Sequence, residues 1–218
     1  GYSSFALIHD SADFGMNAKE FATDYATDLE LNYLTDYTFT LGDTDFSTGL
    51  LKIRNDNPDV IVLWSQTAEA SKVLSQRMQY GLNDIPLVGY AWNYPTQLLE
   101  LCGGEAIDGT TIASAFSLVG IENNPGLKAF VDSYNEYYGG DPSQNAANCY
   151  DTMYLIADAV ERCGVDKTID NTALRDALRT SDFNGVNGKI AFDERGEIIK
   201  GLYMLRFDAE GVHHKVEW

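Results

Sequence analysis

The chain has 218 residues, and its 33 acidic and 15 basic side chains give a formal net charge of −18 at pH 7. A surface with this much negative charge repels a phosphate backbone, and nucleic acid is therefore not expected as a partner. The sequence contains no run of 18 apolar residues that would predict a transmembrane helix. Its first residues do not resemble a signal segment, which would therefore lie outside this sequence.

The first half of the chain alternates predicted strands with predicted helices. Strands are predicted from short apolar or β-rich runs at residues 4–8, 37–41, 60–63, 86–88 and 110–113. Apolar residues at helical spacing predict helices between these strands, with Leu50 and Ile53 sharing one face of the second helix. Pro95 opens a short helix that ends at Gly103. This alternation is typical of an α/β fold with a doubly wound parallel sheet.

The pattern changes after Gly120. Three helices are predicted, beginning near Asn124, after Pro142 and after Asp170, and no β-rich run separates them. We therefore expect these helices to cover a sheet that other residues form. The end of the chain returns to predicted strands, at residues 189–192, 202–207 and 212–216.

Motifs for catalysis or cofactor binding are absent from the sequence. It contains no phosphate-binding GxxxxGK[ST], no GxGxxG after the first strand, no GxSxG and no HExxH. His9 beside Asp10 could serve as a general base, but a strand-end histidine packed under a loop is the commoner case. Asp193 and Glu194 fit a turn better than a catalytic pair of carboxylates. No catalytic residue, cofactor or metal site is predicted, and the protein is not expected to be an enzyme.

Candidate ligand-binding residues follow the ends of the predicted parallel strands. In open α/β sheets, ligands bind outside the carboxyl ends of the strands, where the strand order reverses. The segments in this position supply aromatic walls and neutral polar groups, and two helix starts supply free amides that suit a carboxylate. The predicted ligand-binding residues are Asp13, Phe14, Trp64, Ser65, Gln66, Thr67, Tyr90, Ala91, Trp92 and Phe116. The alternative that these aromatic side chains belong to the core, above all that of Trp64, stays open.

Several short segments occur in an order that is familiar from one family. They read FALIHD (5–10), DFG (13–15), GDTDFS (42–47), NPDVI (57–61), FNGVNG (183–188) and FDERG (192–196). In this order they resemble type I periplasmic binding proteins of the Leu/Ile/Val-binding family. The resemblance covers nearly the whole chain. It implies a non-catalytic, extracytoplasmic solute-binding protein that hands a small carboxylate-bearing ligand, an amino acid or an aromatic acid, to the permease of an ABC importer.

The resemblance also implies a domain division. Members of the family have two lobes that close over a ligand, and this chain is similar to them from the second lobe onward. Residues 1–118 and 197–218 would form the second ligand-binding lobe, and residues 119–196 would belong to a first lobe that lacks roughly the N-terminal third of the family's chain. The helices of that incomplete lobe are then expected to expose apolar faces.

Three positions can be matched to the family's ligand site. Phe14 matches an aromatic residue over the ligand, and Gln66 falls where a tyrosine often contacts it. Ala91 falls where amino-acid binders place an acid that pairs with the ligand's ammonium group. Alanine cannot neutralise a buried charge, so an aromatic carboxylate or a less usual amino acid is expected. Alternatives are a sensory receptor module of the same fold, and a hydrolase-like or flavodoxin-like enzyme, which would need a nucleophile or cofactor loop.

Overall fold

The computed structural model of the chain describes residues 1–90, 95–164 and 170–216. The chain divides into two compact units: unit 1 comprises Gly1–Ser114 and Met204–Trp218, and unit 2 comprises Ala115–Tyr203. In the division expected from the resemblance, the lobe boundaries lie after residues 118 and 196, whereas the unit boundaries lie after residues 114 and 203. No helix in the described ranges is long and apolar enough to span a bilayer.

Unit 1 is built on a seven-stranded sheet with the order β10-β9-β5-β4-β3-β1-β2. The strands are β1 (Ser4–Asp10), β2 (Asn32–Phe39), β3 (Val60–Trp64), β4 (Leu87–Tyr90), β5 (Thr111–Ser114), β9 (Tyr203–Phe207) and β10 (His213–Lys215). Strands β1 to β5 pair in parallel, and β9 pairs antiparallel with β10. The predicted doubly wound α/β fold is therefore confirmed.

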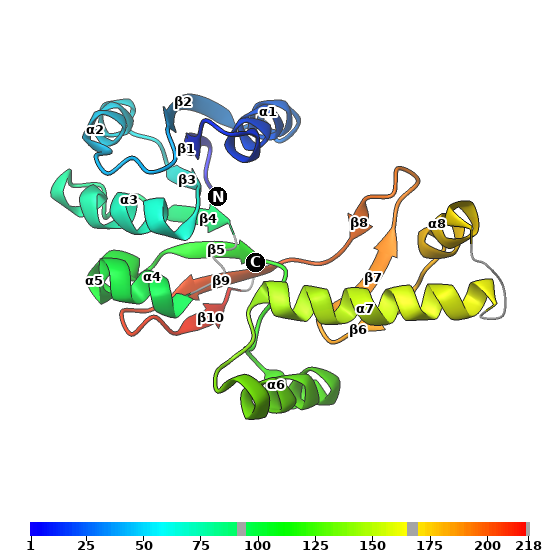
Figure 1. Cartoon of the computed structure of the whole chain (residues 1–218). Coiled ribbons are helices and arrows are strands. Elements are labelled where there is room, and N and C mark those ends of the chain that lie inside the picture. Colours follow the sequence, from blue (N-terminus) through cyan, green and yellow to red (C-terminus); the bar gives the residue numbers. More distant parts are fainter. Residues whose placement is uncertain (91–94, 165–169, 217–218) are drawn as a thin grey trace. The chain divides into compact units, whose positions relative to one another are not determined.

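Helices cover both faces of this sheet, as Figure 1 shows for unit 1. They are α1 (Asp13–Asp28), α2 (Ser47–Asp56), α3 (Thr67–Gln79), α4 (Pro95–Cys102) and α5 (Gly104–Ile107). The main core lies between the sheet and α2 to α5, where Leu50 and Ile53 are fully buried, as predicted. Helix α1 packs on the opposite face through Ala18 and Ala26, whereas Phe21 is 61% exposed. The small side chains let α1 lie close to the sheet.

Asp59 ties the start of the chain to the start of β3. Its Oδ2 accepts hydrogen bonds from the backbone N of Ser3 at 2.8 Å, from Ser3 Oγ at 2.7 Å and from the backbone N of Ser4 at 2.9 Å. These donors favour the charged carboxylate. The hydrogen bonds from Ser3 and Ser4 lower the pKa of Asp59 from 3.8 to about 2.

We expect Asp59→Ala to lower stability in a pH-dependent way. A pKa depressed by folding stabilises the folded state fully above the unfolded value of 3.8, and that contribution is lost as the pH falls towards 2. The difference in thermal midpoint between wild type and variant should be constant above about pH 5 and should shrink below about pH 4. A difference that stays the same down to pH 2 would contradict this assignment.

Unit 2 combines helices with a small antiparallel sheet. Its elements are η1 (Ile121–Asn123), α6 (Pro125–Tyr138), α7 (Gln144–Cys163), α8 (Asn171–Arg179), β6 (Phe183–Gly185), β7 (Gly188–Phe192) and β8 (Ile198–Ile199). Asn124, Ser143 and Asp170 cap the three helices, since each side chain accepts a hydrogen bond from a backbone N–H of the first turn. Within the described residues of 115–203, no strand separates the three helices, as predicted, and β6, β7 and β8 pair only antiparallel.

Helix α7 has one buried side and one exposed apolar side. The buried side follows an i, i+4 spacing that includes Asp151 and Leu155 and faces the small sheet. On the other side Met153 is 68% exposed and Tyr154 is 54% exposed. Exposed apolar faces of this kind usually mark an interaction surface.

Candidate functional site

Three of the predicted ligand-binding residues form an aromatic cluster at the carboxyl ends of the parallel strands in unit 1. Trp64 ends β3 and Tyr90 ends β4, and the register of the two strands places these residues side by side. Their rings stack with centroids 4.2 Å apart and an interplanar angle of 14°. The ring of Phe14, from the first turn of α1, lies 5.4 Å from Trp64 and 6.2 Å from Tyr90.

The cluster is partly open to solvent. The side chain of Phe14 is 38% exposed, and Trp64 and Tyr90 are half-buried. Trp64 therefore does not point into the main core, which was the alternative left open by the sequence. It lies on the face of the sheet that carries α1.

Two helices begin beside this cluster without a side-chain cap. Ala12 precedes α1 and Gln66 precedes α3, and neither residue caps its helix through a side-chain hydrogen bond. The backbone N of Ala12 bonds to Oδ1 of Asp10. The amides that follow lie in the first turn, where the helix dipole adds partial positive charge. Such helix starts suit a carboxylate.

Buried polar atoms without partners lie in the same region. Ser65 is 4% exposed, and neither its Oγ nor Nε1 of Trp64 has a hydrogen-bond partner among the described residues. Leaving such a group unpaired costs about 1–3 kcal/mol. A polar ligand atom that reached these groups would remove that cost.

His9 is fully buried and takes no part in an open site. Its Nδ1 lies 2.9 Å from the carbonyl oxygen of Asp10, and its Nε2 lies 3.0 Å from Oγ1 of Thr38. Asp10 itself is 1% exposed, and its Oδ1 accepts a hydrogen bond from the backbone N of Ala12. The interpretation of His9 as a packed strand-end histidine therefore fits the structure better than that of a general base.

The other predicted site residues have different surroundings. Asp13 and Gln66 are exposed and Thr67 is half-buried, all at the helix starts described above. Ala91 and Trp92 lie outside the described residues. Phe116 belongs to unit 2, where it is 8% exposed and is part of that unit's own core.

One neighbour of the cluster was not found from the sequence. Ala113 on β5 is paired with Tyr90, so it occupies the next position in the same row of the sheet. Its small apolar side chain gave no functional signal. The strand predicted at residues 110–113 ends at Ala113, so its position at the carboxyl end of the sheet could have been predicted.

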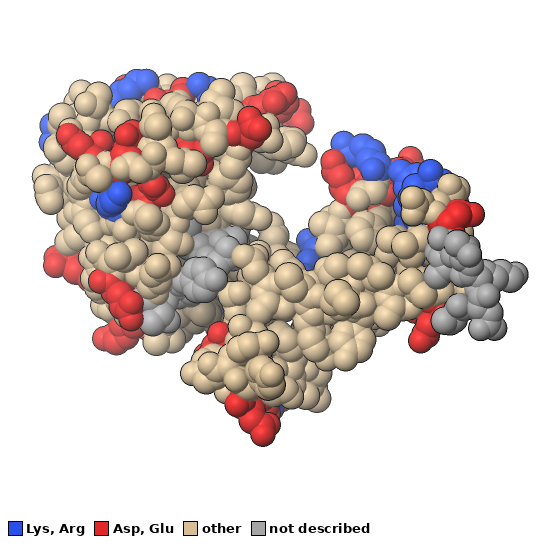
Figure 2. Space-filling model, viewed as in Figure 1, with Lys and Arg blue, Asp and Glu red and all other residues tan. Residues whose placement is uncertain are grey.

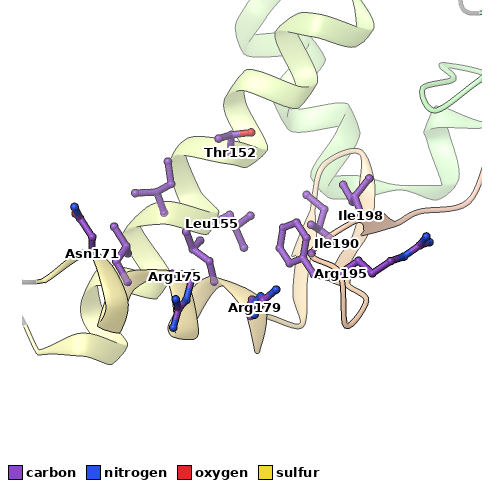
Figure 3. A pocket seen from close by; sticks show the side chains of 13 residues that line it. Thr152, Leu155, Asn171, Arg175, Arg179, Ile190, Arg195 and Ile198 are labelled. Atoms are coloured by element: carbon purple, nitrogen blue, oxygen red, sulfur yellow. The ribbon is translucent and has the colours of Figure 1, made fainter. Parts of the chain in front are cut away.

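Unit 2 contains a separate pocket of about 780 Å³, shown in Figure 3. Helices α7 and α8 and the strands β7 and β8 line it, with an apolar floor that includes Leu155, Leu178 and Ile190. Three arginines lie around this floor, and Figure 2 shows basic side chains, with acidic ones among them, on this part of the surface. None of the predicted ligand-binding residues that the structure describes lines this pocket.

The three arginines already have partners. Arg175 pairs with Asp176 at 2.7 Å, and Arg195 pairs with Glu197 at 2.8 Å. Nη2 of Arg179 donates to the carbonyl oxygen of Glu194 at 3.3 Å. The pocket is therefore mainly an apolar surface, and its charges are largely satisfied. The described residues contain no group of three or more side chains that could hold a metal ion.

The fold of unit 1 is a doubly wound α/β fold, with the aromatic cluster at the carboxyl ends of its parallel strands. The family described as periplasmic binding protein matches residues 1–212, and the chain belongs to this family. It is 22% identical over 203 residues to Leu/Ile/Val-binding protein homolog 7 of Brucella melitensis. That match covers 88% of this chain and 49% of the relative, so the chain spans about half the length of that protein.

Solved structures show the same fold. A leucine-binding protein from Thermotoga maritima superposes with a TM-score of 0.86 and 27% identity, covering 100% of this chain and 60% of that one. An ABC transporter solute-binding protein from R. palustris, in complex with benzoate, superposes with a TM-score of 0.82 and 19% identity, covering 99% of this chain and 58% of that one. These relatives are substrate-binding proteins. The expected type I periplasmic-binding-protein fold is thereby confirmed.

Proposed function

We propose that the protein captures a small carboxylate-bearing ligand, an amino acid or an aromatic acid, and delivers it to the permease of an ABC importer. The observation that carries this proposal is the aromatic cluster of Phe14, Trp64 and Tyr90 beside two uncapped helix starts. Apolar walls with a few convergent polar groups are the usual composition of a small-molecule site. An extracytoplasmic location, in the periplasm or on the cell surface through a lipid anchor, is part of the proposal.

The helix starts and the aromatic cluster would bind different parts of the ligand. The amides at the starts of α1 and α3, together with Ser65 Oγ, would bind the carboxylate by hydrogen bonds and helix dipoles. The aromatic cluster would bury the apolar part of the ligand. The relatives bind ligands of both kinds, since one is named for leucine and another is in complex with benzoate.

We further propose that residues 1–118 and 197–218 act as the second ligand-binding lobe, and that residues 119–196 belong to a first lobe that further polypeptide completes. Two features of unit 2 support this division. Helix α7 exposes Met153 and Tyr154 on one side, and the 780 Å³ pocket has an apolar floor. Both surfaces suit packing against additional secondary structure, because burial of apolar area stabilises such contacts.

The proposal is tested by a thermal-shift screen on the protein expressed from its complete gene, with calorimetry on each hit. A ligand that binds only the folded state raises stability by about 2.7 kcal/mol at 100 times its Kd. We expect a clear rise in the midpoint with one or more carboxylates from sets of amino acids and aromatic acids. A well-folded protein that responds to none of them would contradict the transport function and would favour the sensory alternative.

A variant of Phe14 locates the site. We expect Phe14→Ala to weaken binding of the best carboxylate roughly tenfold, because an aromatic contact contributes up to about 1.5 kcal/mol beyond its buried area. Phe21→Ala is the matched control, since Phe21 lies on the same helix and is 61% exposed. Calorimetry should show an unchanged Kd for the control. Equal Kd values for both variants and the wild type would place the ligand elsewhere.

A further inference from the structure

The last row of side chains on one face of the sheet in unit 1 contains three rings and then a methyl group. His9 is paired with Trp64, and Tyr90 is paired with Ala113. Trp64 and Tyr90 stand side by side at the ends of β3 and β4. Paired residues of parallel strands point to the same face. The row across β1, β3, β4 and β5 is therefore His9, Trp64, Tyr90 and Ala113.

The spacing of this row is the spacing of stacked rings. Neighbouring strands lie about 4.7–4.9 Å apart, and the rings of Trp64 and Tyr90 lie 4.2 Å apart at 14°. A third ring placed above Ala113 would lie one strand further along, at a comparable distance from Tyr90. The side chain of Ala113 is half-buried, as is that of Tyr90. A methyl group fills much less of this position than a ring would.

We propose that the ligand carries a planar aromatic ring that occupies the position above Ala113 and stacks on Tyr90. The protein would then prefer an aromatic acid to a branched aliphatic amino acid. This inference rests on the proposed function, because it assigns a ligand class to the same site. A planar ring can stack on Tyr90 in an offset geometry, which an aliphatic side chain cannot do, and such a pair adds to the gain from burial alone.

The test is calorimetric titration of the protein expressed from its complete gene with benzoate and with leucine. We expect benzoate to bind at least roughly tenfold tighter than leucine. Tyr90→Leu should weaken benzoate binding roughly tenfold, and Tyr90→Phe, which keeps the ring, should bind benzoate more tightly than Tyr90→Leu does. Ala113→Leu should fill the position and weaken benzoate binding by at least roughly tenfold.

Tyr33→Leu is the matched control. Tyr33 stacks on Phe5 at 4.9 Å and 5°, near the opposite end of the same sheet, so this variant removes a stacked tyrosine away from the proposed site. Its Kd for benzoate should equal that of the wild type. Thermal midpoints of all variants establish that they are folded, and Tyr90→Leu tests the stack if Ala113→Leu does not fold.

Two results would overturn the inference in different ways. Leucine binding tighter than benzoate, or benzoate binding that is unchanged in Tyr90→Leu, would remove the aromatic ligand class and leave the transport function standing. No binding of benzoate, leucine or any other carboxylate in the screen would overturn the ligand class together with the proposed function.

Discussion

Replacement of Asp151 by alanine is expected to lower the free energy of unfolding by about 3 kcal/mol. The carboxylate is 1% exposed, and it accepts hydrogen bonds from the backbone N of Val186 at 2.7 Å and of Asn187 at 3.0 Å. These two donors lie in the turn between β6 and β7. Alanine would leave both amides without the partner that holds the turn against α7.

Asp158→Ala is the matched control for this variant. Asp158 lies on the same helix but is 47% exposed, and it pairs with Arg162 at 2.9 Å. An exposed pair of this kind contributes about 0.5 kcal/mol or less. Hydrogen exchange should be faster at Val186 and Asn187 in Asp151→Ala and unchanged there in Asp158→Ala. Equal exchange at these two amides in all three proteins would show that Asp151 does not hold the turn.

Replacement of Gly15 by alanine is expected to cost about 3 kcal/mol in unit 1. A Cβ atom at this position would lie 2.1 Å from the carbonyl oxygen of Asp10 and 2.7 Å from its backbone N. Backbone atoms of a buried strand cannot move aside as a flexible side chain can. The start of α1 would have to shift away from β1, which would also displace the adjacent Phe14.

Gly126→Ala is the control for the glycine substitution. Gly126 lies in the first turn of α6, where an added Cβ would lie 3.7 Å from Oδ1 of Asn124, an ordinary contact distance. Alanine there should stabilise the helix by up to about 1 kcal/mol. Denaturant unfolding followed by circular dichroism reports on the helices of both units, so it can measure both substitutions. A midpoint for Gly15→Ala equal to that of the wild type would contradict the close packing of α1.

Much of unit 1 could be predicted from the sequence because its strands and helices are regular. Short apolar runs placed four of the five parallel strands, and the spacing of Leu50 and Ile53 placed the buried face of α2. The strand predicted at residues 37–41 is β2, which begins five residues earlier, at Asn32. The face of α1 could not be found in this way. The residues at helical spacing are Phe14, Ala18, Phe21, Tyr25 and Leu29. Of these only Ala18 is buried, and the sheet meets the small residues Ala18 and Ala26. Close approach of backbones, and not hydrophobicity, decides that contact.

The site was predicted in part. The rule that ligands bind at the carboxyl ends of parallel strands brought Phe14, Trp64 and Tyr90 together. Ala113 ends the strand predicted at residues 110–113, but its place beside Tyr90 was not predicted, because the order and register of the strands are non-local properties. Strands β6 and β8 were missed for a similar reason: they have three and two residues, too few for a periodic pattern, and only pairing with β7 makes them strands.

The connection between the two units has a consequence for protein engineering. The chain leaves the sheet of unit 1 after β5, forms unit 2 and returns to the sheet at β9. Strands β5 and β9 are neighbours in the sheet. Hydrogen bonds join the backbone of Gly109 and Thr110, before β5, to Phe207 at the end of β9, so the two strands run in opposite directions, as Figure 1 shows. The end of β5 at Ser114 and the start of β9 at Tyr203 therefore lie beside each other. A two-residue turn can join such strands, so a gene with residues 115–202 replaced by such a turn would still encode all seven strands. The same junction would accept a foreign domain, such as a fluorescent reporter, as a graft.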